Sequence, residues 1–236
     1  MVNVLPQLTR FGGAALNLLF PRFCVGCGKE GVFLCGACVS SLPHIQPPVC
    51  PECGLPQSDG SLCRNCQDWQ ADIDGIRSPF RFEGAIREAV HYLKYRNLRA
   101  IAPALACLMA DYLENNPLNV EVLVPVPLHK QRLRLRGYNQ SALLANELGK
   151  RSCLRVDETV LVREKYALPQ ARTSSVAERR ANVMGVFTCR GRGVNGKRVL
   201  LIDDVATSGA TMNACASALK AGGAVVVWGL ALAREI

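Results

Sequence analysis

The chain has 236 residues, of which 49% are hydrophobic and 20% are charged, so it is long enough for one α/β domain and a small additional module. This composition excludes an intrinsically disordered chain, and no apolar run reaches the roughly 18–20 residues that a membrane-spanning helix needs. The formal net charge of +9 favours a nucleic-acid-binding protein, but cysteines that bind a metal as thiolates would add negative charge and reduce this excess.

The first apolar segment covers residues 11–20 and follows Arg10. Asn17 interrupts this segment and no small-residue cleavage site comes after it, so a short amphipathic helix packed on the protein is favoured over a signal peptide. Because neither a signal peptide nor a membrane span is evident, we expect a cytoplasmic protein.

Four Cys-x-x-Cys pairs occupy the first third of the chain. Tetrahedral zinc takes four thiolates, and each Cys-x-x-Cys turn presents two of them on one side of a tight loop. The expected ligands of two structural zinc ions are Cys24, Cys27, Cys35, Cys38, Cys50, Cys53, Cys63 and Cys66. Sequential pairing, with the first four cysteines on one zinc, is preferred, and interleaved pairing stays open. We expect a double zinc ribbon over residues 18–70 and the main domain over residues 71–236.

Zinc binding is favoured over a disulfide framework because no signal peptide is evident. Catalytic zinc is disfavoured, since four protein thiolates leave no open coordination position. Each occupied site would hold four thiolates against one Zn²⁺, so two sites would bring the net charge from +9 to +5. A mild excess of this size is more typical of a solvated surface than of a DNA-binding face.

Residues 67–82 are predicted to form a connector that ends in a strand. Apolar residues at helical spacing then predict helices over residues 84–96 and 100–114, and a strand is predicted over residues 121–124. The cations of Lys94–Arg96 close the first of these helices. They are either ordinary partners of the helix dipole or contacts for a pyrophosphate.

The strand is followed by the basic segment PVPLHKQRLRLRGYNQS, residues 125–141. Its prolines predict a stiff loop at the carboxyl end of the strand, and three arginines alternate with leucines before Gly137 introduces a helix that runs to about Lys150. Three interpretations stay open for the basic cluster: a solvated loop, a pyrophosphate contact, and a contact with nucleic-acid phosphates.

Residues 159–163 and 186–189 are plausible strands, and residues 164–184 between them show no clear sheet pattern. Long loops in compact domains are usually functional or mobile. A last apolar strand is predicted over residues 225–232.

The most informative stretch is RVLLIDDVATSGATMNACASALKAG, residues 198–222. Residues 199–202 are typical of a strand buried on both faces, and Asp203 and Asp204 follow directly. A loop of small residues, Thr207–Thr211, then leads into a helix. Loop amides and a helix N-terminus favour a phosphate, and the carboxylates lie within reach of a ribose diol. We therefore expect a ribose 5-phosphate at the carboxyl end of this strand.

This stretch resembles the phosphoribosyl pyrophosphate (PRPP) motif of the type I phosphoribosyltransferases and differs from a P-loop. The order of the motifs narrows the match: four Cys-x-x-Cys pairs, VPVPLHKQRLRLRGYNQS, PQARTSSVAERRANVMGVF, and then the PRPP motif. Nearly the whole chain thereby resembles the ComF family, which includes the GntX-type DNA-utilisation proteins. The resemblance implies a type I phosphoribosyltransferase-like α/β fold, mostly parallel and flanked by helices, and a role in natural competence, DNA uptake or DNA utilisation.

The resemblance also implies site residues. Asp203 and Asp204 would hold the ribose hydroxyls as the catalytic pair, with Mg²⁺ bound together with PRPP, and residues 164–182 would cover the reacting centre. The 5-phosphate would be bound by Thr207, Ser208, Gly209, Ala210 and Thr211. The pyrophosphate would be bound by Pro127, Leu128, His129, Lys130, Arg132 and Arg136.

Two classes of function follow. The first is an enzyme that transfers the phosphoribosyl group of PRPP to an acceptor, through positioning and charge stabilisation. The second is a non-enzymatic accessory: a PRPP sensor, a scaffold, or a protein that binds single-stranded DNA or the competence machinery. Aromatic residues make up only 6% of the chain, which argues against strong base stacking. A transcription regulator ranks last because no helix-turn-helix pattern is visible.

Overall fold

The computed structural model describes residues 21–164 and 185–236. The helix expected over residues 11–20 lies outside the described residues, and so does the covering loop expected over residues 164–182, apart from its first residue.

The described elements alternate between strands and helices along the main domain. The helices are α2 (Gly36–Ser40), α3 (Gly84–Tyr95), α4 (Ala102–Asn115), α5 (Lys130–Arg136), α6 (Gln140–Ser152) and α8 (Ala210–Ala221), with a 3-10 turn (Arg99–Ile101) before α4. The strands are β1 (Gly75–Arg77), β2 (Phe80–Arg81), β3 (Val122–Pro125), β4 (Arg155–Val156), β5 (Leu161–Arg163), β6 (Phe187–Cys189), β7 (Arg198–Ala206) and β8 (Val226–Arg234).

The main sheet is parallel and has the strand order β1-β8-β7-β3-β4, with β2 also paired to β8. Its centre is the β7–β8 pair, in which Leu200 lies opposite Trp228 and Ile202 opposite Leu230. A separate antiparallel pair joins β5 to β6. The predicted fold class is therefore confirmed: a mostly parallel sheet flanked by helices, with a smaller cysteine-rich module.

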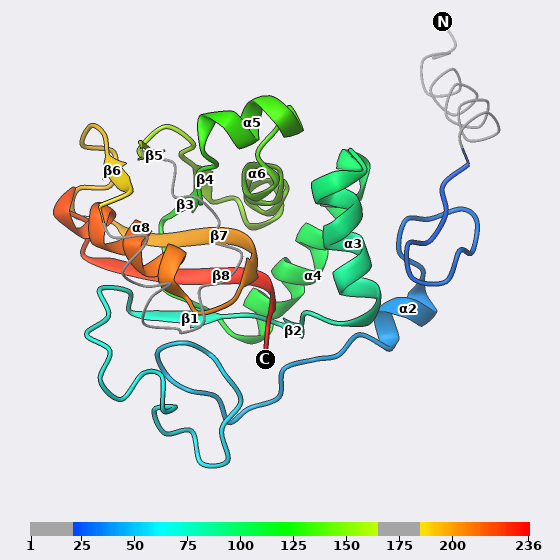
Figure 1. Ribbon diagram of the computed structural model, residues 1–236, viewed down its shortest axis with the longest axis horizontal. Coiled ribbons are helices and arrows are strands. Elements are labelled where there is room, and N and C mark those ends of the chain that lie inside the picture. Colours follow the sequence, from blue (N-terminus) through cyan, green and yellow to red (C-terminus); the bar gives the residue numbers. More distant parts are fainter. Residues whose placement is uncertain (1–20, 165–184) are drawn as a thin grey trace, which may run out of the picture.

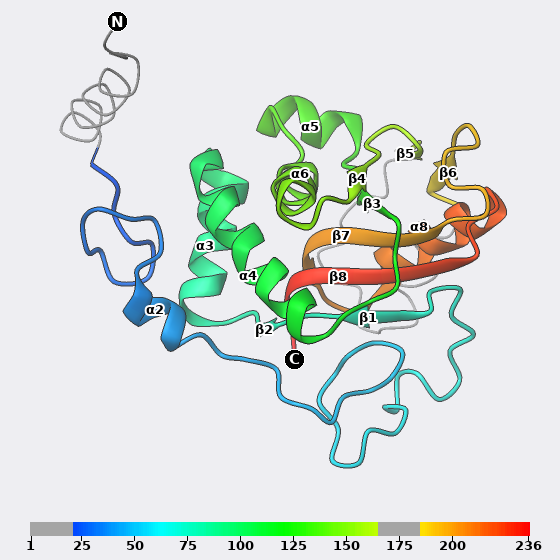
Figure 2. The same cartoon turned by 180° about the vertical axis from the view of Figure 1, so that it is seen from behind.

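Helices cover both faces of the sheet (Figures 1 and 2). Leu200 and Ile202 of β7 pack into a core with α3, α4 and α6, whereas Val199 and Leu201 point the other way and pack with α8 and the β5–β6 pair. Because side chains alternate along a strand, the apolar run that predicted this strand is buried on both of its faces.

The basic segment after β3 is helical, so the predicted loop is wrong for residues 130–136. His129 caps the helix, its Nδ1 accepting a hydrogen bond of 3.2 Å from the Gln131 amide, and Gly137 ends it in the left-handed conformation with φ +79°. The alternation of Arg and Leu does not distinguish a short exposed helix from a loop. Leu133 and Leu135 are both exposed, so the segment shows no buried apolar face. Leu135 is 90% exposed.

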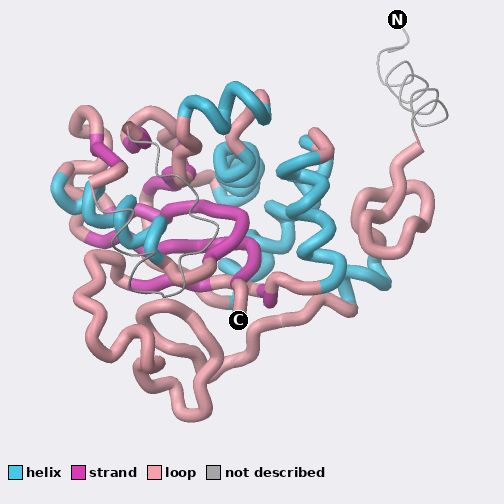
Figure 3. The backbone as a smooth tube through the Cα atoms, in the orientation of Figure 1, coloured by secondary structure: helices cyan, strands magenta, loops and turns pink. Residues whose placement is uncertain are grey.

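The cysteine-rich module has little regular structure apart from α2 (Figure 3). Its first loop, blue in Figure 1, lies beside α2 and α3, and its second loop, light blue to cyan, lies below β1. The stretch between the loops pairs with the edge of the main domain, since the Ile45 amide donates to the Pro79 carbonyl (2.9 Å) and the Arg81 amide to the Pro43 carbonyl (2.8 Å). Among the described residues, none of the helices is long and apolar enough to span a bilayer.

Candidate functional site

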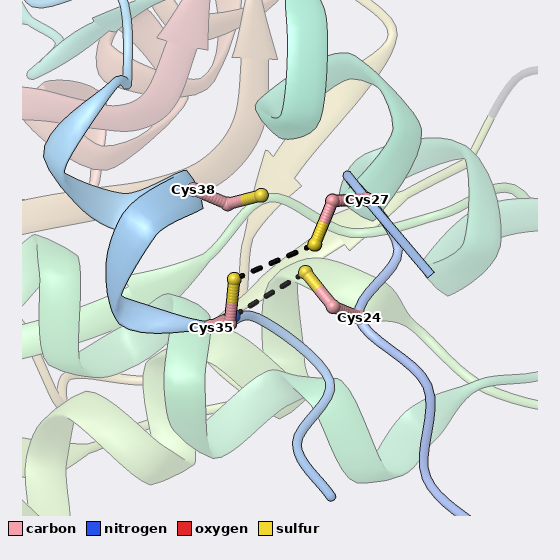
Figure 4. Close-up of side chains that lie close together, drawn as sticks. All are labelled: Cys24, Cys27, Cys35 and Cys38. Atoms are coloured by element: carbon pink, nitrogen blue, oxygen red, sulfur yellow. Dashed lines mark hydrogen bonds between the residues drawn. The ribbon is translucent and has the colours of Figure 1, made fainter. Parts of the chain in front are cut away.

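The eight cysteines of the module converge in two groups of four, and the grouping is sequential. Within each group, the sulfur atoms all lie within 4.8 Å of one another. Four thiolates around a tetrahedral zinc with Zn–S bonds of about 2.3 Å would be about 3.8 Å apart, so both groups fit a structural zinc ion. The first group consists of Cys24, Cys27, Cys35 and Cys38, and Figure 4 shows their side chains pointing toward one another. The second group consists of Cys50, Cys53, Cys63 and Cys66.

The two groups repeat one local design. In each, the amide of the third cysteine donates to the sulfur of the first: Cys35 to Cys24 over 3.3 Å and Cys63 to Cys50 over 3.5 Å. The second and third sulfurs of each group are 3.6 Å apart. The glycine after each opening pair, Gly28 or Gly54, has a φ near +75°, which a residue with a side chain rarely adopts.

Hydrogen bonds favour the thiolate form of one buried cysteine in each group and raise the pKa of a neighbouring one, Cys66 or Cys38. The hydrogen bond from the Cys66 thiol outweighs burial and lowers the pKa of Cys53 to about 5. Burial acts to raise the pKa of Cys24, but hydrogen bonds led by the Cys35 amide outweigh it and bring the pKa to about 6. The thiolate is the form that binds zinc.

The two groups differ in burial and in their contacts with the main domain. All four cysteines of the second group are buried, whereas Cys27 of the first is exposed. The second group also docks on β1: the Ile76 amide donates to the Glu52 carbonyl over 2.6 Å, and Arg77 Nη1 donates to the Pro51 carbonyl over 2.9 Å.

The acidic pair lies at the carboxyl edge of the parallel sheet. Asp203 and Asp204 belong to β7 itself, which extends to Ala206 rather than ending at residue 202. The neighbouring strand β3 ends at Pro125, opposite Ile202, and the Val126 amide donates to the Ile202 carbonyl over 2.9 Å. The acidic pair and the start of the basic segment are therefore adjacent, as predicted for parallel strands.

Asp204 is almost fully buried and forms an ion pair that the sequence did not predict. Its Oδ2 lies 2.9 Å from Nζ of Lys94, with side-chain exposures of 3% and 20%. Lys94 stands in the last turn of α3, whose end is held by the Tyr138 hydroxyl donating to the Leu93 carbonyl. The cations at the end of this helix indicated only a contact with the helix dipole or with a pyrophosphate. The sequence around Lys94 gives no sign of Asp204, because the two residues are far apart in the chain.

Asp203 is held by two donors. The Ser141 hydroxyl and the Asp204 amide donate to its Oδ1 over 2.8 Å and 2.9 Å. Burial, followed by the negative charge of Asp204, raises the pKa of Asp203 to about 7, and the ammonium of Lys94 only partly offsets this. Ser141 was missed by sequence reasoning; it is fully buried in the first turn of α6.

The turn between β7 and α8 leads into the helix through Gly209, which has no side chain to cap it. Gly209 caps α8 in the left-handed conformation with φ +77°, and no side chain of the cap residue bonds the helix. The Ala210 amide reaches the Ser208 hydroxyl over 3.4 Å, a weak hydrogen bond. Thr207 is exposed, and Thr211 is the second residue of α8.

A hollow of about 180 Å³ connects the acidic pair with the basic helix. Lys94, Ser141 and Arg163 line it as well, and Arg136 is fixed there by a hydrogen bond from Nη1 to Gln140 Oε1. Of the predicted site residues, the hollow gathers Pro127, Leu128, Arg132, Arg136, Asp203, Asp204 and Thr211. It is not lined by His129, Lys130, Thr207, Ser208, Gly209 or Ala210.

Fold and site together define an α/β domain with an acidic pair at its carboxyl edge and a double four-cysteine module. A family model described as "Double zinc ribbon domain" matches residues 15–67. The chain is 31% identical over 197 residues to "Competence protein ComFC" of Bacillus subtilis, covering 79% of this chain and 77% of the relative. The chain belongs to the ComF family.

Other relatives carry related names. "Competence protein F" of Haemophilus influenzae is 29% identical, with 85% of this chain and 90% of the relative covered. "DNA utilization protein YhgH" of Escherichia coli K12 is 27% identical, with 86% and 91% covered.

Solved structures with partial likeness include a PRPP amidotransferase from B. subtilis, at 21% identity and a TM-score of 0.37. The match covers 56% of this chain and only 26% of the amidotransferase, so the chain spans about a quarter of that protein's length. A hypoxanthine phosphoribosyl transferase from Trypanosoma cruzi matches at 18% identity and a TM-score of 0.32, with 56% of this chain and 62% of that chain covered.

Proposed function

We propose that the α/β domain binds PRPP, or a similar ribose 5-phosphate ligand, together with Mg²⁺. The observation that carries the proposal is the Asp203–Asp204 pair, in which Asp204 is buried and Asp203 is partly buried. The pair lies one short loop before the N-terminus of α8 and shares a hollow with Arg132 and Arg136. Carboxylates for a diol, helix amides for a phosphate and arginines for a second phosphate group are the three features that such a ligand requires.

Each part of the site then has a binding role. The carboxylates of Asp203 and Asp204 would accept hydrogen bonds from the ribose hydroxyls, and the loop from Thr207 to Thr211 would hold the 5-phosphate. Arg132 and Arg136 would bind the pyrophosphate. Bound Mg²⁺ would neutralise pyrophosphate charge, and carboxylate and phosphate oxygens are ligands that it favours. Asp204 Oδ2 makes no hydrogen bond within the described residues, so a ligand hydroxyl or cation that displaced Lys94 would find an available oxygen.

Calorimetric titration of the zinc-loaded protein with PRPP, with and without Mg²⁺, tests this assignment. We expect micromolar binding that requires Mg²⁺ and that weakens by at least about tenfold, or 1.4 kcal/mol, in Asp204→Asn. Asp111→Asn is the matched control, because Asp111 is an exposed carboxylate on α4 outside the hollow. Failure of the folded wild-type protein to bind PRPP under either condition would contradict the proposal.

Affinity for PRPP with Mg²⁺ is expected to rise between pH 6 and pH 8. The pKa of Asp203 is raised to about 7, so the carboxyl is mostly protonated at pH 6 and ionised at pH 8, and the ionised form binds a cation or a diol better. Below that pKa the gain is up to about tenfold per pH unit. Asp203→Asn keeps an oxygen for the Ser141 hydroxyl but cannot ionise. Its pH profile should retain only the titration of PRPP itself, and an unchanged slope would refute the role given to Asp203.

The wider role that we propose is in DNA uptake or utilisation, following the printed names of the relatives, and we propose the cytoplasm as its location. PRPP binding would serve either transfer to an acceptor or sensing. Turnover of PRPP with release of pyrophosphate in the presence of candidate acceptors would separate the two.

A second candidate, direct binding of single-stranded DNA, is favoured by the surface of α5. This helix exposes Leu133 and Leu135 between arginines, with Leu135 90% exposed. The arginines of such a surface would contact nucleic-acid phosphates, and the leucines would add apolar contact beside them. Affinity for an oligonucleotide that falls steeply with salt would support this candidate, and absence of binding at low salt would exclude it.

A further inference from the structure

The phosphate loop rests on the cysteine-rich module. A Cβ atom at Gly209 would lie 2.8 Å from Cδ1 of Ile76 and 3.3 Å from Cη2 of Trp69, so both side chains press against the backbone at the start of α8. Ile76 belongs to β1, but Trp69 follows the last cysteine of the second group by only three residues. The indole thus forms the floor of the turn to which the 5-phosphate binding is assigned.

Trp69 is positioned by the second zinc site. The Cys66 amide donates to the Cys63 carbonyl over 2.8 Å, and the Trp69 amide donates to the Cys66 carbonyl over 3.1 Å. These bonds form a turn that starts at one zinc ligand, passes through another and ends at the indole. Trp69 also packs against the buried cysteines of this group, so the ligand geometry and the indole position are one unit.

The same segment is tied to α8 at a second point. Asn213, in the first turn of α8, accepts hydrogen bonds at Oδ1 from the amides of Asp72 (2.8 Å) and Ile73 (3.1 Å). Because Gly209 and Asn213 are four residues apart, they lie one above the other on the helix. Two contacts from residues 69–73 therefore fix the position of the helix N-terminus.

Charge links the second zinc site to the main domain as well. Arg234, in the last strand, is only 2% exposed, and its Nε and Nη1 make no hydrogen bond within the described residues. Burial lowers the pKa of Arg234, and the negative charges of the four cysteines of the second group partly offset this effect. A zinc held by four thiolates carries a net charge of −2, which accounts for a buried guanidinium at this place.

From these contacts we infer that Trp69 is a positioning residue for the phosphate loop, and that zinc at the second site and ligand binding at the loop are thermodynamically coupled. The inference rests on the proposed ribose 5-phosphate site. Coupling is reciprocal, so a ligand that orders the loop raises the affinity of the second site for zinc. The first group of cysteines lies against Ala85 of α3 and not against α8. Zinc at the first site is therefore not expected to be coupled to the phosphate loop.

Trp69→Ala tests the inference in the full-length, zinc-loaded protein. We expect it to keep two zinc ions per chain, to speed hydrogen exchange of the amides of residues 207–213 by about tenfold, and to weaken binding of PRPP–Mg²⁺ by a similar factor. Trp69→Phe should restore only part of both properties, because a phenyl ring lacks the outer indole carbons, Cη2 and Cζ3, that lie against Gly209. Phe23→Ala is the matched control: Phe23 is an exposed aromatic residue beside the first group and should change neither property.

The outcomes separate the two proposals. Unchanged exchange at residues 207–213 in Trp69→Ala would overturn the inference, and so would an equal increase across the whole of β7 and α8, which would indicate general destabilisation. Faster exchange confined to the loop, in a protein whose wild type does not bind PRPP, would support the positioning role and reject the proposed ligand.

The reciprocal effect is measured by equilibrium competition for zinc with a chelator of known affinity. Hydrogen exchange at residues 50–66 and at residues 24–38 identifies which site has lost its zinc. PRPP–Mg²⁺ should raise the zinc affinity of the second site and leave that of the first unchanged in the wild-type protein. Equal zinc affinity of the second site with and without ligand, in a protein that binds PRPP, would overturn the coupling.

Discussion

Cys53→Ser is expected to prevent stable folding of the α/β domain, whereas Cys27→Ser should leave that domain folded. Cys53 is buried in a group whose loop accepts hydrogen bonds from β1 at the carbonyls of Pro51 and Glu52. The buried Arg234 depends on the same thiolates for its counter-charge. A structural zinc contributes on the order of 10–16 kcal/mol to folding, more than the whole stability of a typical domain. Cys27 is exposed, and its group lies at the periphery beside α2 and α3.

The measurement is denaturant unfolding, monitored by far-UV circular dichroism, together with zinc content. Cys27→Ser should lose one zinc ion and lower the unfolding midpoint only modestly. Cys53→Ser should lose its cooperative transition or accumulate in the insoluble fraction. Similar midpoints for the two variants would mean that the second zinc site is as peripheral as the first, which would also remove the support for the role of Trp69.

Local sequence was sufficient to predict the elements that carry their own signal. The buried run before Asp203 predicted a central parallel strand, and the helical spacing of apolar residues predicted α3, α4 and α8 within a few residues of their observed bounds. The Cys-x-x-Cys spacing predicted four ligands per zinc. It left the pairing open, because spacing alone does not say which loops converge, and the fold settled it as sequential.

The residues that the sequence did not reveal act through contacts between distant segments. Lys94 meets Asp204 only because α3 packs beside the end of β7, and Ser141 reaches Asp203 only because α6 starts there. In the sequence, Trp69 is an isolated aromatic residue in a connector. Its contact with the backbone of Gly209 is known only from the fold. Motif matching finds side chains that touch a ligand, whereas those that hold the loop or balance a buried charge have no fixed spacing from the motif.

Lys94→Met is expected to destabilise the protein by about 3 kcal/mol, because it leaves the carboxylate of Asp204 buried without its cation. The methionine keeps most of the apolar stem of lysine, so lost packing is a small part of this effect. Asp204→Asn alone leaves the ammonium of Lys94, which is 20% exposed, with partial access to water. It should therefore cost less than Lys94→Met.

The double variant Lys94→Met with Asp204→Asn should recover most of the stability lost in Lys94→Met, because no buried charge is left unpaired. Urea unfolding of the four proteins at one pH and fixed zinc gives the coupling energy of the pair. A coupling close to zero would show that the ion pair does not hold α3 against β7. The same variants separate stability from function: the double variant should be folded and yet bind PRPP–Mg²⁺ at least about tenfold more weakly, because a neutral amide replaces the carboxylate assigned to the ligand.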